Sequence, residues 1–226
     1  MHKEKIGCFI IHGFGGNRQE IMPLVNKLKE AGYKTATPLL AGHETCRSEM
    51  AKARYNDWIF SAETELKKFY QQCDHVIIIG FSMGGLVATH LVEKHKVDAL
   101  ILINTPYYYW NISQIIKNIF SSFKVYVKKY ALSGTKNPFR TLLEFLHFLN
   151  ITKPLFKTIN CPTLVMQTLD DDTVGPKSAE HIYALISAQK HIKKYKSGGH
   201  MIFEHSSFSK IYIDIYEFIK TQSQEF

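Results

Sequence analysis

The chain has 226 residues, of which 45% are hydrophobic and 21% are charged, and its formal net charge is +8. These values suit one globular domain with a sizeable core, and no apolar run approaches the roughly 20 residues that a membrane helix needs. The N-terminus lacks a small-residue cleavage site, so we expect a cytoplasmic protein without a transmembrane segment. The four cysteines form no CxxC pair, which fits buried thiols in a reducing compartment.

The positive charge is concentrated in one part of the chain. Residues 105–158 contain seven Lys, one Arg and a single acid, Glu144, which gives this segment a net charge of +7. No nucleic-acid-binding motif accompanies these residues, so we expect no nucleic-acid partner. A solvated exterior is the preferred interpretation of the charge, and weak contact with an anionic lipid surface is the alternative.

Apolar runs and amphipathic helical faces alternate in the first 103 residues. The expected strands are 6–11, 33–37, 76–79 and 97–103, and the expected helices between them are 20–31, 57–70 and 83–93. Strands that alternate with helices predict an α/β fold with a mostly parallel, doubly wound sheet.

This alternation stops at Thr105 and resumes near residue 162. Only helical faces occur between these points, with apolar stripes at 112–123 and 142–149. The remaining expected strands are 162–167 and 191–195, and the remaining helices are 177–186 and 207–220. We therefore expect one core made of residues 1–104 and 159–226. Residues 105–158 would form a helical lid inserted between two strands of the same sheet.

Ser82 lies in a Gly-Phe-Ser-Met-Gly motif between an expected strand and an expected helix. Glycines on both sides permit a sharp turn that exposes the serine above the sheet. The free N–H groups and the positive dipole end of the helix point at the same spot. We interpret Ser82 as a nucleophile, with a tight turn carrying a solvent-facing serine as the alternative.

A serine nucleophile needs a base and an orienting acid, which in this architecture follow it on loops after later strands. His200 follows the last expected strand and is the expected base. Three consecutive aspartates, Asp170, Asp171 and Asp172, follow the strand before it. Adjacent side chains point in different directions, so the residues alone leave the choice of acid open.

Two backbone N–H groups are the expected oxyanion donors, those of Met83 and Phe14. Phe14 belongs to the glycine-rich loop 12–16, in which His12 is interpreted as a residue that braces the turn. The chain has no GxxxxGK[ST] and no complete GxGxxG after a strand. We expect neither a cofactor nor a metal ion.

Six segments together resemble the α/β-hydrolase superfamily, and within it the small bacterial carboxylesterases and monoacylglycerol lipases. They are IIHGFGGN, PLLAGHE, NDW, GFSMGG, CPTLVMQTLDDDTVGPKSA and SGGH. The segments follow the family's order, and only the insertion has no specific match.

Carried over by position, the resemblance implies that Ser82 is the nucleophile and His200 the base. The register of the aspartates relative to the following proline implies that Asp171 is the acid. The resemblance also implies that the amides of Phe14 and Met83 bind the oxyanion.

Two segments depart from the family pattern. The usual Gly-His-Gly is Gly-His-Glu at residues 42–44, which adds a charge near the rim of the site. Two glycines, Gly198 and Gly199, precede the final histidine where one is common. Neither change removes a catalytic group.

The insertion is expected to determine the substrate, because twelve aromatic residues lie between Tyr107 and Phe156. The expected substrate-pocket residues are Tyr107, Tyr108, Trp110, Ile116, Ile119, Leu142, Leu146 and Val174. An equal alternative is that these apolar stripes only fasten the insertion to the sheet.

We expect hydrolysis of short- to medium-chain acyl esters through an acyl-serine intermediate. A monoacylglycerol lipase is one alternative, and a thioesterase or acyltransferase with the same triad is another. A non-catalytic binding protein of the same fold is the alternative from a different class. The sequence leaves the oligomeric state open.

Overall fold

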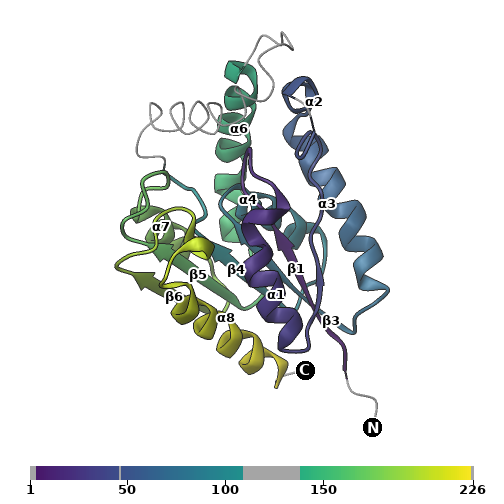
Figure 1. Ribbon diagram of the computed structural model, residues 1–226, viewed down its shortest axis with the longest axis vertical. Helices are drawn as coiled ribbons and strands as arrows, with labels where there is room; N and C mark the ends of the chain where they lie inside the picture. Colours follow the sequence, from purple (N-terminus) through teal and green to yellow (C-terminus); the bar gives the residue numbers. More distant parts are fainter. Residues whose placement is uncertain (1–3, 46, 109–137, 225–226) are drawn as a thin grey trace.

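The computed structural model describes residues 4–45, 47–108 and 138–224, and a single sheet forms its centre (Figure 1). Six strands lie in the order β2-β1-β3-β4-β5-β6, and each neighbouring pair is parallel. The strands are β1 (Ile6–Ile11), β2 (Lys34–Ala36), β3 (His75–Phe81), β4 (Ala99–Ile103), β5 (Thr163–Thr168) and β6 (Lys190–Tyr195). The predicted α/β class and parallel sheet are confirmed.

The central strands β1, β3 and β4 are almost entirely apolar because helices cover both faces of the sheet. Successive side chains of a strand point to opposite faces. Phe9 and Ile11 of β1 therefore join the hydrophobic cluster on one face, whereas Cys8 and Ile10 join the cluster on the other. Full burial of one large aliphatic or aromatic side chain contributes about 1.5–3 kcal/mol, so these two clusters hold the layers together.

Two layers of helices cover the sheet (Figure 1). On one face lie α1 (Met22–Glu30) and α8 (Phe208–Ser223), and on the other lie α3 (Tyr55–Tyr70), α4 (Met83–Lys94) and α7 (Lys177–Leu185). The shorter helical segments are η1 (Arg18–Ile21), α2 (Arg47–Lys52), η2 (Lys153–Thr158) and η3 (Ile202–Glu204).

The described part of the chain between β4 and β5 contains η2 and α6 (Pro138–Thr152). α6 packs on α4, where the ring of Phe148 stacks on His90 with centroids 5.2 Å apart. The imidazole Nε2 of His90 lies 3.0 Å from the Thr152 hydroxyl. The expected apolar stripe at 142–149 thus lies in α6, while the stripe at 112–123 lies outside the described residues. The division into core and lid stays a prediction.

Several element boundaries differ from expectation. The helix expected at 20–31 is divided into η1 and α1, and α2 and the other 3-10 segments were not expected. These pieces are short, and a segment of three to six residues carries too little hydrophobic periodicity to be recognised.

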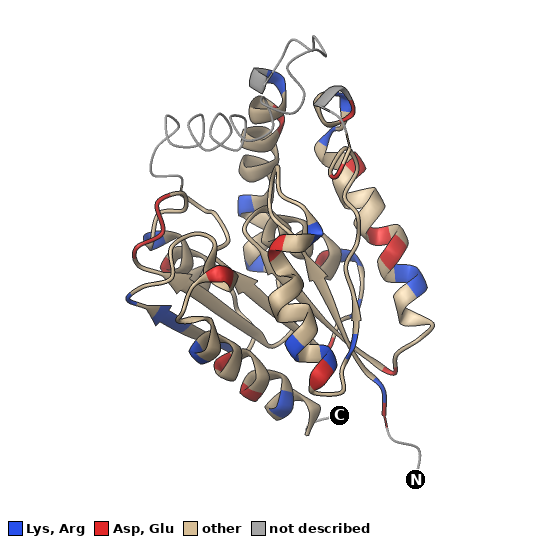
Figure 2. Ribbon diagram, viewed as in Figure 1, with Lys and Arg blue, Asp and Glu red and all other residues tan. Residues whose placement is uncertain are grey.

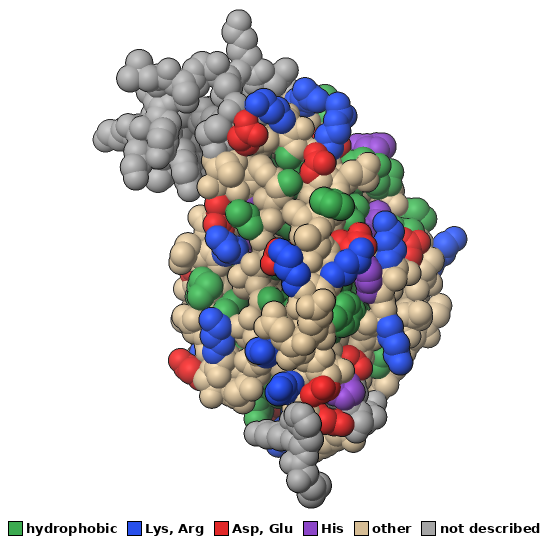
Figure 3. Space-filling model, turned by 90° about the vertical axis from the view of Figure 1, so that its right-hand side faces the viewer, with side chains coloured by type: hydrophobic (Ala, Val, Ile, Leu, Met, Phe, Trp, Pro, Cys, Tyr) green, Lys and Arg blue, Asp and Glu red, His purple; other side chains and the backbone are tan. Residues whose placement is uncertain are grey.

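Charged side chains of the described residues lie on the outer helices, the loops and the edge strand β6 (Figure 2). On the side formed by α3, apolar side chains are scattered singly among the charged ones (Figure 3), and Phe60 is the most exposed of the described large hydrophobic residues. None of the helices within the described ranges is long and apolar enough to cross a membrane. Most of the lysines of the basic segment 105–158 lie outside the described residues.

The order of the strands reverses between β1 and β3. From β1 the chain crosses to β2 at one side, and then returns to place β3 at the other side of β1. The helices that follow β1 and β3 therefore pack on opposite faces of the sheet, and the carboxyl ends of these two strands form its topological switch point. The glycine-rich loop 12–16 and Ser82 are both found at this switch point.

Candidate active site

Ser82 forms a sharp turn between β3 and α4. Its backbone has φ 52° and ψ −122°, and its N–H donates a hydrogen bond of 2.9 Å to the Ile103 carbonyl. The residue is only 4% exposed. A residue other than glycine in this conformation costs about 1–3 kcal/mol and is held there by its surroundings. The structure places Ser82 as the strand-turn-helix motif predicts.

Glycines around Ser82 allow close approach of the backbone. A Cβ atom at Gly84 would collide with the carbonyl groups of Ile11 and His12 at the end of β1. A Cβ atom at Gly13 would lie 3.3 Å from the Cβ of Ser82. The N-terminus of α4 and the glycine-rich loop 12–16 are therefore packed against one another, with Ser82 between them.

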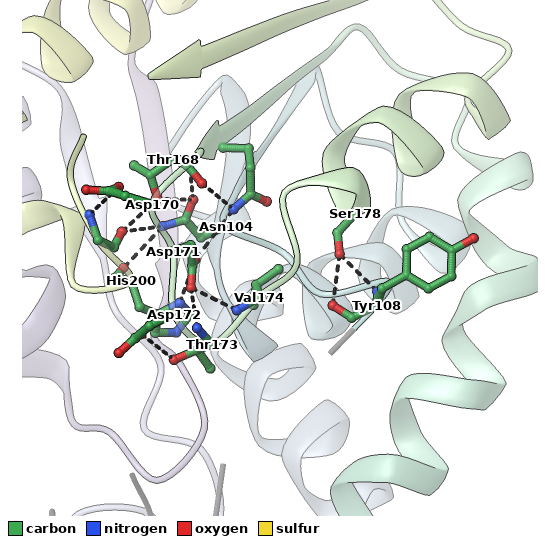
Figure 4. A network of polar contacts seen from close by, with 12 residues as sticks. Asn104, Tyr108, Thr168, Asp170, Asp171, Asp172, Thr173, Val174, Ser178 and His200 are labelled. Atoms are coloured by element: carbon green, nitrogen blue, oxygen red, sulfur yellow. Dashed lines mark hydrogen bonds and ion pairs between the residues drawn. The ribbon is translucent and has the colours of Figure 1, made fainter. Parts of the chain in front are cut away.

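Asp171 and His200 meet at the carboxyl ends of β5 and β6 (Figure 4). The Asp171 Oδ2 and His200 Nδ1 atoms are 2.9 Å apart, and the carboxylate side chain is fully buried. The N–H groups of Thr173 and Val174 each donate a 2.8 Å hydrogen bond to the other oxygen, Oδ1. These two bonds fix the carboxylate, which leaves Oδ2 directed at the imidazole.

The two neighbouring aspartates have other partners. The Gly198 and Gly199 amides donate hydrogen bonds of 3.2 and 2.9 Å to the Asp170 carboxylate. Partial desolvation raises the pKa of Asp170, but these two bonds outweigh it and leave the pKa below its ordinary value. Asp172 accepts a 2.9 Å bond from the hydroxyl of Thr173. Of the three carboxylates, Asp171 is the one bonded to His200.

The His200 ring lies next to the Ser82 turn. It packs on the ring of Phe81, the residue before Ser82, with centroids 5.3 Å apart. Phe81 in turn contacts Phe203 of η3 at 5.1 Å, in an edge-to-face arrangement. The imidazole is thus held between the carboxylate of Asp171 and the end of β3.

Phe14, the expected second oxyanion donor, lies in a cluster of aromatic rings. The centroid of its ring is 4.8 Å from that of Phe145 in α6 and 5.9 Å from that of Trp58 in α3. Met83 is the first residue of α4 and is fully buried. The loop after β1 is therefore supported by side chains from two helices.

His43 braces the same loop from the side. Its Nε2 accepts a 3.3 Å hydrogen bond from the Gly15 N–H, and its Nδ1 lies 3.2 Å from the Ala41 carbonyl. Burial lowers the pKa of His43 to about 4, so the ring stays neutral and keeps its acceptor at neutral pH. The ring of His12 is 5.0 Å away, and desolvation also lowers the pKa of His12.

Glu44, where the sequence departs from the family pattern, adopts φ 57°, a left-handed conformation that glycine accepts readily. Its carboxylate is bound by Arg18, through the backbone N–H at 2.7 Å and the guanidinium at 2.9 and 2.8 Å. These hydrogen bonds lower the pKa of Glu44 to about 2. The extra charge at the rim is thus neutralised by an ion pair that joins loop 41–45 to η1.

Glu20 was not expected near the site. It belongs to η1, and its carboxyl group lies over Gly16 of the glycine-rich loop. Burial raises the pKa of Glu20 to about 7, although the charge of His200 acts in the opposite direction, and the charge of Glu204 raises it further. The only signal in the sequence is an acid shortly after the glycine-rich loop, which is too common to mark a site.

The expected substrate-pocket residues are only partly placed. Val174 is fully buried, Leu142 is buried in α6, and Leu146 packs against the same hydrophobic cluster. Trp110, Ile116 and Ile119 lie outside the described residues.

The two tyrosines at the start of the insertion contact α7. The Tyr108 N–H donates to the Ser178 hydroxyl at 2.9 Å, and the Tyr108 hydroxyl is 3.2 Å from His181 Nδ1. Tyr107 packs on the His181 ring at 4.2 Å. Figure 4 shows Tyr108 on the far side of Val174 from His200, so Tyr108 fastens the insertion to α7 in this structure.

A family model described as the alpha/beta hydrolase fold matches residues 9–149, more than half of the chain. The chain belongs to the α/β-hydrolase family. The match includes the loop after β1 and the Ser82 turn, so the predicted family is confirmed.

Two relatives from Bacillus align with nearly the whole chain. A thermostable monoacylglycerol lipase of Bacillus sp. (strain H-257) is 28% identical over 215 residues, which cover 87% of this chain and 83% of the relative. A carboxylesterase of Bacillus subtilis (strain 168) is 23% identical over 225 residues, which cover 93% of this chain and 91% of the relative.

Solved structures share the fold. A metagenome-derived lipolytic enzyme superposes with a TM-score of 0.80 at 21% identity, covering 96% of this chain and 94% of the other. A soluble variant of monoglyceride lipase from Saccharomyces cerevisiae superposes with a TM-score of 0.76 at 16% identity, covering 98% of this chain and 88% of the other. At these identities the likeness concerns the fold alone.

Proposed function

We propose that this α/β hydrolase is a serine carboxylic ester hydrolase that acts on short- to medium-chain acyl esters. The observation that carries the proposal is the 2.9 Å contact between the buried Asp171 carboxylate and His200, next to the strained Ser82 turn. A buried carboxylate bonded to one ring nitrogen leaves the other nitrogen as a proton acceptor, which is what a weak serine nucleophile needs.

In the proposed mechanism, His200 Nε2 removes the Ser82 hydroxyl proton as Oγ attacks the ester carbonyl carbon. The imidazolium then donates this proton to the leaving alcohol, and acyl-Ser82 forms. A water molecule repeats the cycle: His200 takes a proton from water as the water oxygen attacks the acyl carbon. The imidazolium then returns this proton to Ser82 Oγ as the acyl–oxygen bond breaks and the acid is released. Asp171 holds the imidazole in the tautomer with its proton on Nδ1 and stabilises the imidazolium.

The oxyanion would be stabilised by the N–H groups of Met83 and Phe14. Met83 begins α4, whose N-terminal N–H groups and dipole favour negative charge. The support that Phe145 and Trp58 give to Phe14, and that His43 gives to Gly15, would keep the second donor in place before substrate binds.

Monoacylglycerols are the second candidate substrate class. The names of the two bacterial relatives, a monoacylglycerol lipase and a carboxylesterase, support ester hydrolysis in general. The higher identity of the first favours monoacylglycerol among the longer esters. Cytoplasmic location and weak contact of the basic insertion with anionic lipid also belong to this proposal.

The test is a series of p-nitrophenyl esters from C2 to C16, with a monoacylglycerol and an acyl thioester assayed beside it. Ser82→Ala is expected to lower kcat by a factor of about 10⁴–10⁶ without changing thermal unfolding. Ser223→Ala, which removes a half-buried hydroxyl at the end of α8, is the matched control. Preference for the thioester would identify a thioesterase.

A fluorophosphonate probe tests the remaining alternative, a non-catalytic binding protein of the same fold. It should label wild-type protein at Ser82 and leave Ser82→Ala unlabelled. Absence of labelling and of ester turnover in the wild type would identify a binding protein that only shares the fold.

A further inference from the structure

Asn104 occupies an unusual position at the carboxyl end of β4. It is fully buried, and its backbone has φ 46°, a left-handed conformation in which Asn is among the few residues tolerated. Its N–H donates a 2.9 Å hydrogen bond to the Met166 carbonyl of β5. The backbone of Asn104 is therefore fixed to the neighbouring strand, and its side chain is aimed by the turn.

The side chain of Asn104 joins two loops of the proposed active site (Figure 4). Its Oδ1 accepts hydrogen bonds from the N–H and the hydroxyl of Thr168, at 3.0 and 3.3 Å. Its Nδ2 donates to the carbonyl groups of Gly199 and His200, each at 3.2 Å. All four bonds are buried or half-buried, where polar groups need partners.

The loop that carries His200 depends on such bonds. Gly198 and Gly199 have φ values of 156° and 58°, and glycines impose little conformational restraint of their own. Thr168 donates a further 2.7 Å bond from its hydroxyl to the Gly199 carbonyl, and Asp170 accepts the amides of both glycines. The carbonyl side of the loop is thus held by Asn104 and Thr168, and the amide side by Asp170.

We propose that Asn104 is a positioning residue for His200, which fixes the main chain of the base while Asp171 fixes its ring. This inference rests on the proposed function, since it assigns a role within the same reaction. An amide is required because both ends of the side chain are used: one accepts from Thr168 and the other donates to two carbonyl groups. Aspartate has the same shape but would turn an oxygen toward those carbonyls.

The experiment replaces the amide donor by a carboxylate oxygen. Asn104→Asp keeps the acceptor for Thr168 and tolerates the left-handed backbone, but loses both bonds to the His200 loop. We expect kcat to fall about 10- to 100-fold, as for a catalytic group displaced by about 1 Å, while KM changes less than about twofold. Asn56→Asp, the same change on the exposed side of α3, is the matched control and should behave as the wild type.

Two further measurements keep the test decisive. Activity is divided by the number of sites that a fluorophosphonate titrates, and unfolding is followed by circular dichroism. If Asn104→Asp does not fold, Asn104→Gly, which also accepts φ 46°, takes its place. Thr168→Val should give a smaller loss in the same direction, because it removes one of the bonds to Gly199.

The proton on His200 Nδ1 gives a readout independent of ester hydrolysis. Its NMR signal should be sharp in the wild type and weakened in Asn104→Asp. A folded Asn104→Asp protein with kcat within twofold of the wild type and an unchanged signal would overturn the inference. A wild type that neither hydrolyses esters nor labels at Ser82 would overturn the proposed function instead, and the NMR signal would still decide whether Asn104 positions His200.

Discussion

The three consecutive aspartates after β5 show how one turn separates side chains that are adjacent in sequence. Asp170 faces the Gly198-Gly199 amides, Asp171 faces His200, and Asp172 bonds Thr173. Each carboxylate therefore has a different task, although all three have the same charge. Only the middle one can act on the imidazole.

Substitution of these aspartates by asparagine should lower kcat to different extents. Asp171→Asn would turn a donor toward His200 Nδ1 and favour the wrong tautomer, so we expect kcat to fall by about 10⁴. Asp170→Asn keeps an acceptor for the Gly199 amide and should cost less than about tenfold.

Steady-state kinetics on one ester, with both variants compared in the same buffer, measure this difference. A larger loss for Asp170→Asn would show that the neighbouring carboxylate is the acid. Asp172→Asn, whose carboxylate bonds only Thr173 among the contacts described for it, is the control and should match the wild type.

At the residue level, local sequence predicted Ser82 and His200 because each follows a recognisable strand in a glycine-rich turn. The residues alone did not choose among the aspartates, since their directions depend on the turn that Thr173 and Val174 form. Asn104 and Glu20 were missed for a different reason. Their partners are far away in sequence: Thr168 and the His200 loop for Asn104, and His200 for Glu20.

Loops rather than strands carry the proposed oxyanion site, and His43 connects two of them. It accepts the Gly15 N–H from loop 12–16 while its own loop is held to η1 by the Arg18–Glu44 pair. The ring is buried, whereas Gly15 itself is exposed, so the bond lies at the edge of the loop. The position of Phe14 therefore depends on an element outside the expected catalytic motifs.

His43→Phe tests this dependence. The variant fills the space but removes the side-chain acceptor of the Gly15 N–H, which costs about 0.5–1.5 kcal/mol of unfolding free energy. We expect kcat to fall about tenfold or more, with urea unfolding measured beside it. His191→Phe on the exposed edge strand β6 is the control. Unchanged kcat in a destabilised His43→Phe protein would restrict His43 to a structural role.

Helices and strands could be predicted from the sequence where they bury many apolar side chains. Both faces of the sheet are covered, so β1, β3 and β4 stand out as apolar runs, and the long amphipathic helices α3 and α8 show a clear period. The polar six-residue α2 shows neither pattern. The packing of α6 on α4, through Phe148 and His90, depends on contacts about sixty residues apart and has no local signature.

The stability of the whole molecule should depend on pH through Glu20. Its pKa is about 7 in the folded protein and 4.5 in the ordinary case, so the folded state holds a proton that the unfolded chain releases between these values. The stabilising contribution is complete below pH 4.5 and is lost as the pH rises through 7. The loss amounts to about 3 kcal/mol at 1.36 kcal/mol per unit of pKa.

Glu20→Gln cannot ionise and should avoid this loss. The unfolding free energy of the variant minus that of the wild type should rise by about 2–3 kcal/mol from pH 5 to pH 8. Urea unfolding at both pH values measures the gain, and Glu217→Gln on α8 is the control. An equal difference between variant and wild type at the two pH values would contradict the prediction.

Ser82, Asn104, Asp171 and His200 follow four strands that are neighbours in the sheet, β3, β4, β5 and β6. Parallel strands bring their carboxyl ends to one edge, so residues up to 118 positions apart in sequence converge there. The topology accounts for the meeting of these groups, and the loops determine their orientation.

Both described ends of the insertion are tied to the core. At its entry, the Tyr108 carbonyl accepts hydrogen bonds from the Gly175 amide and the Ser178 hydroxyl. At its exit, the Glu144 carboxylate accepts a 3.1 Å bond from the Tyr55 N–H at the start of α3. The two flanks of residues 109–137 therefore have separate attachments, one to α7 and one to α3, so weakening one attachment leaves the other in place.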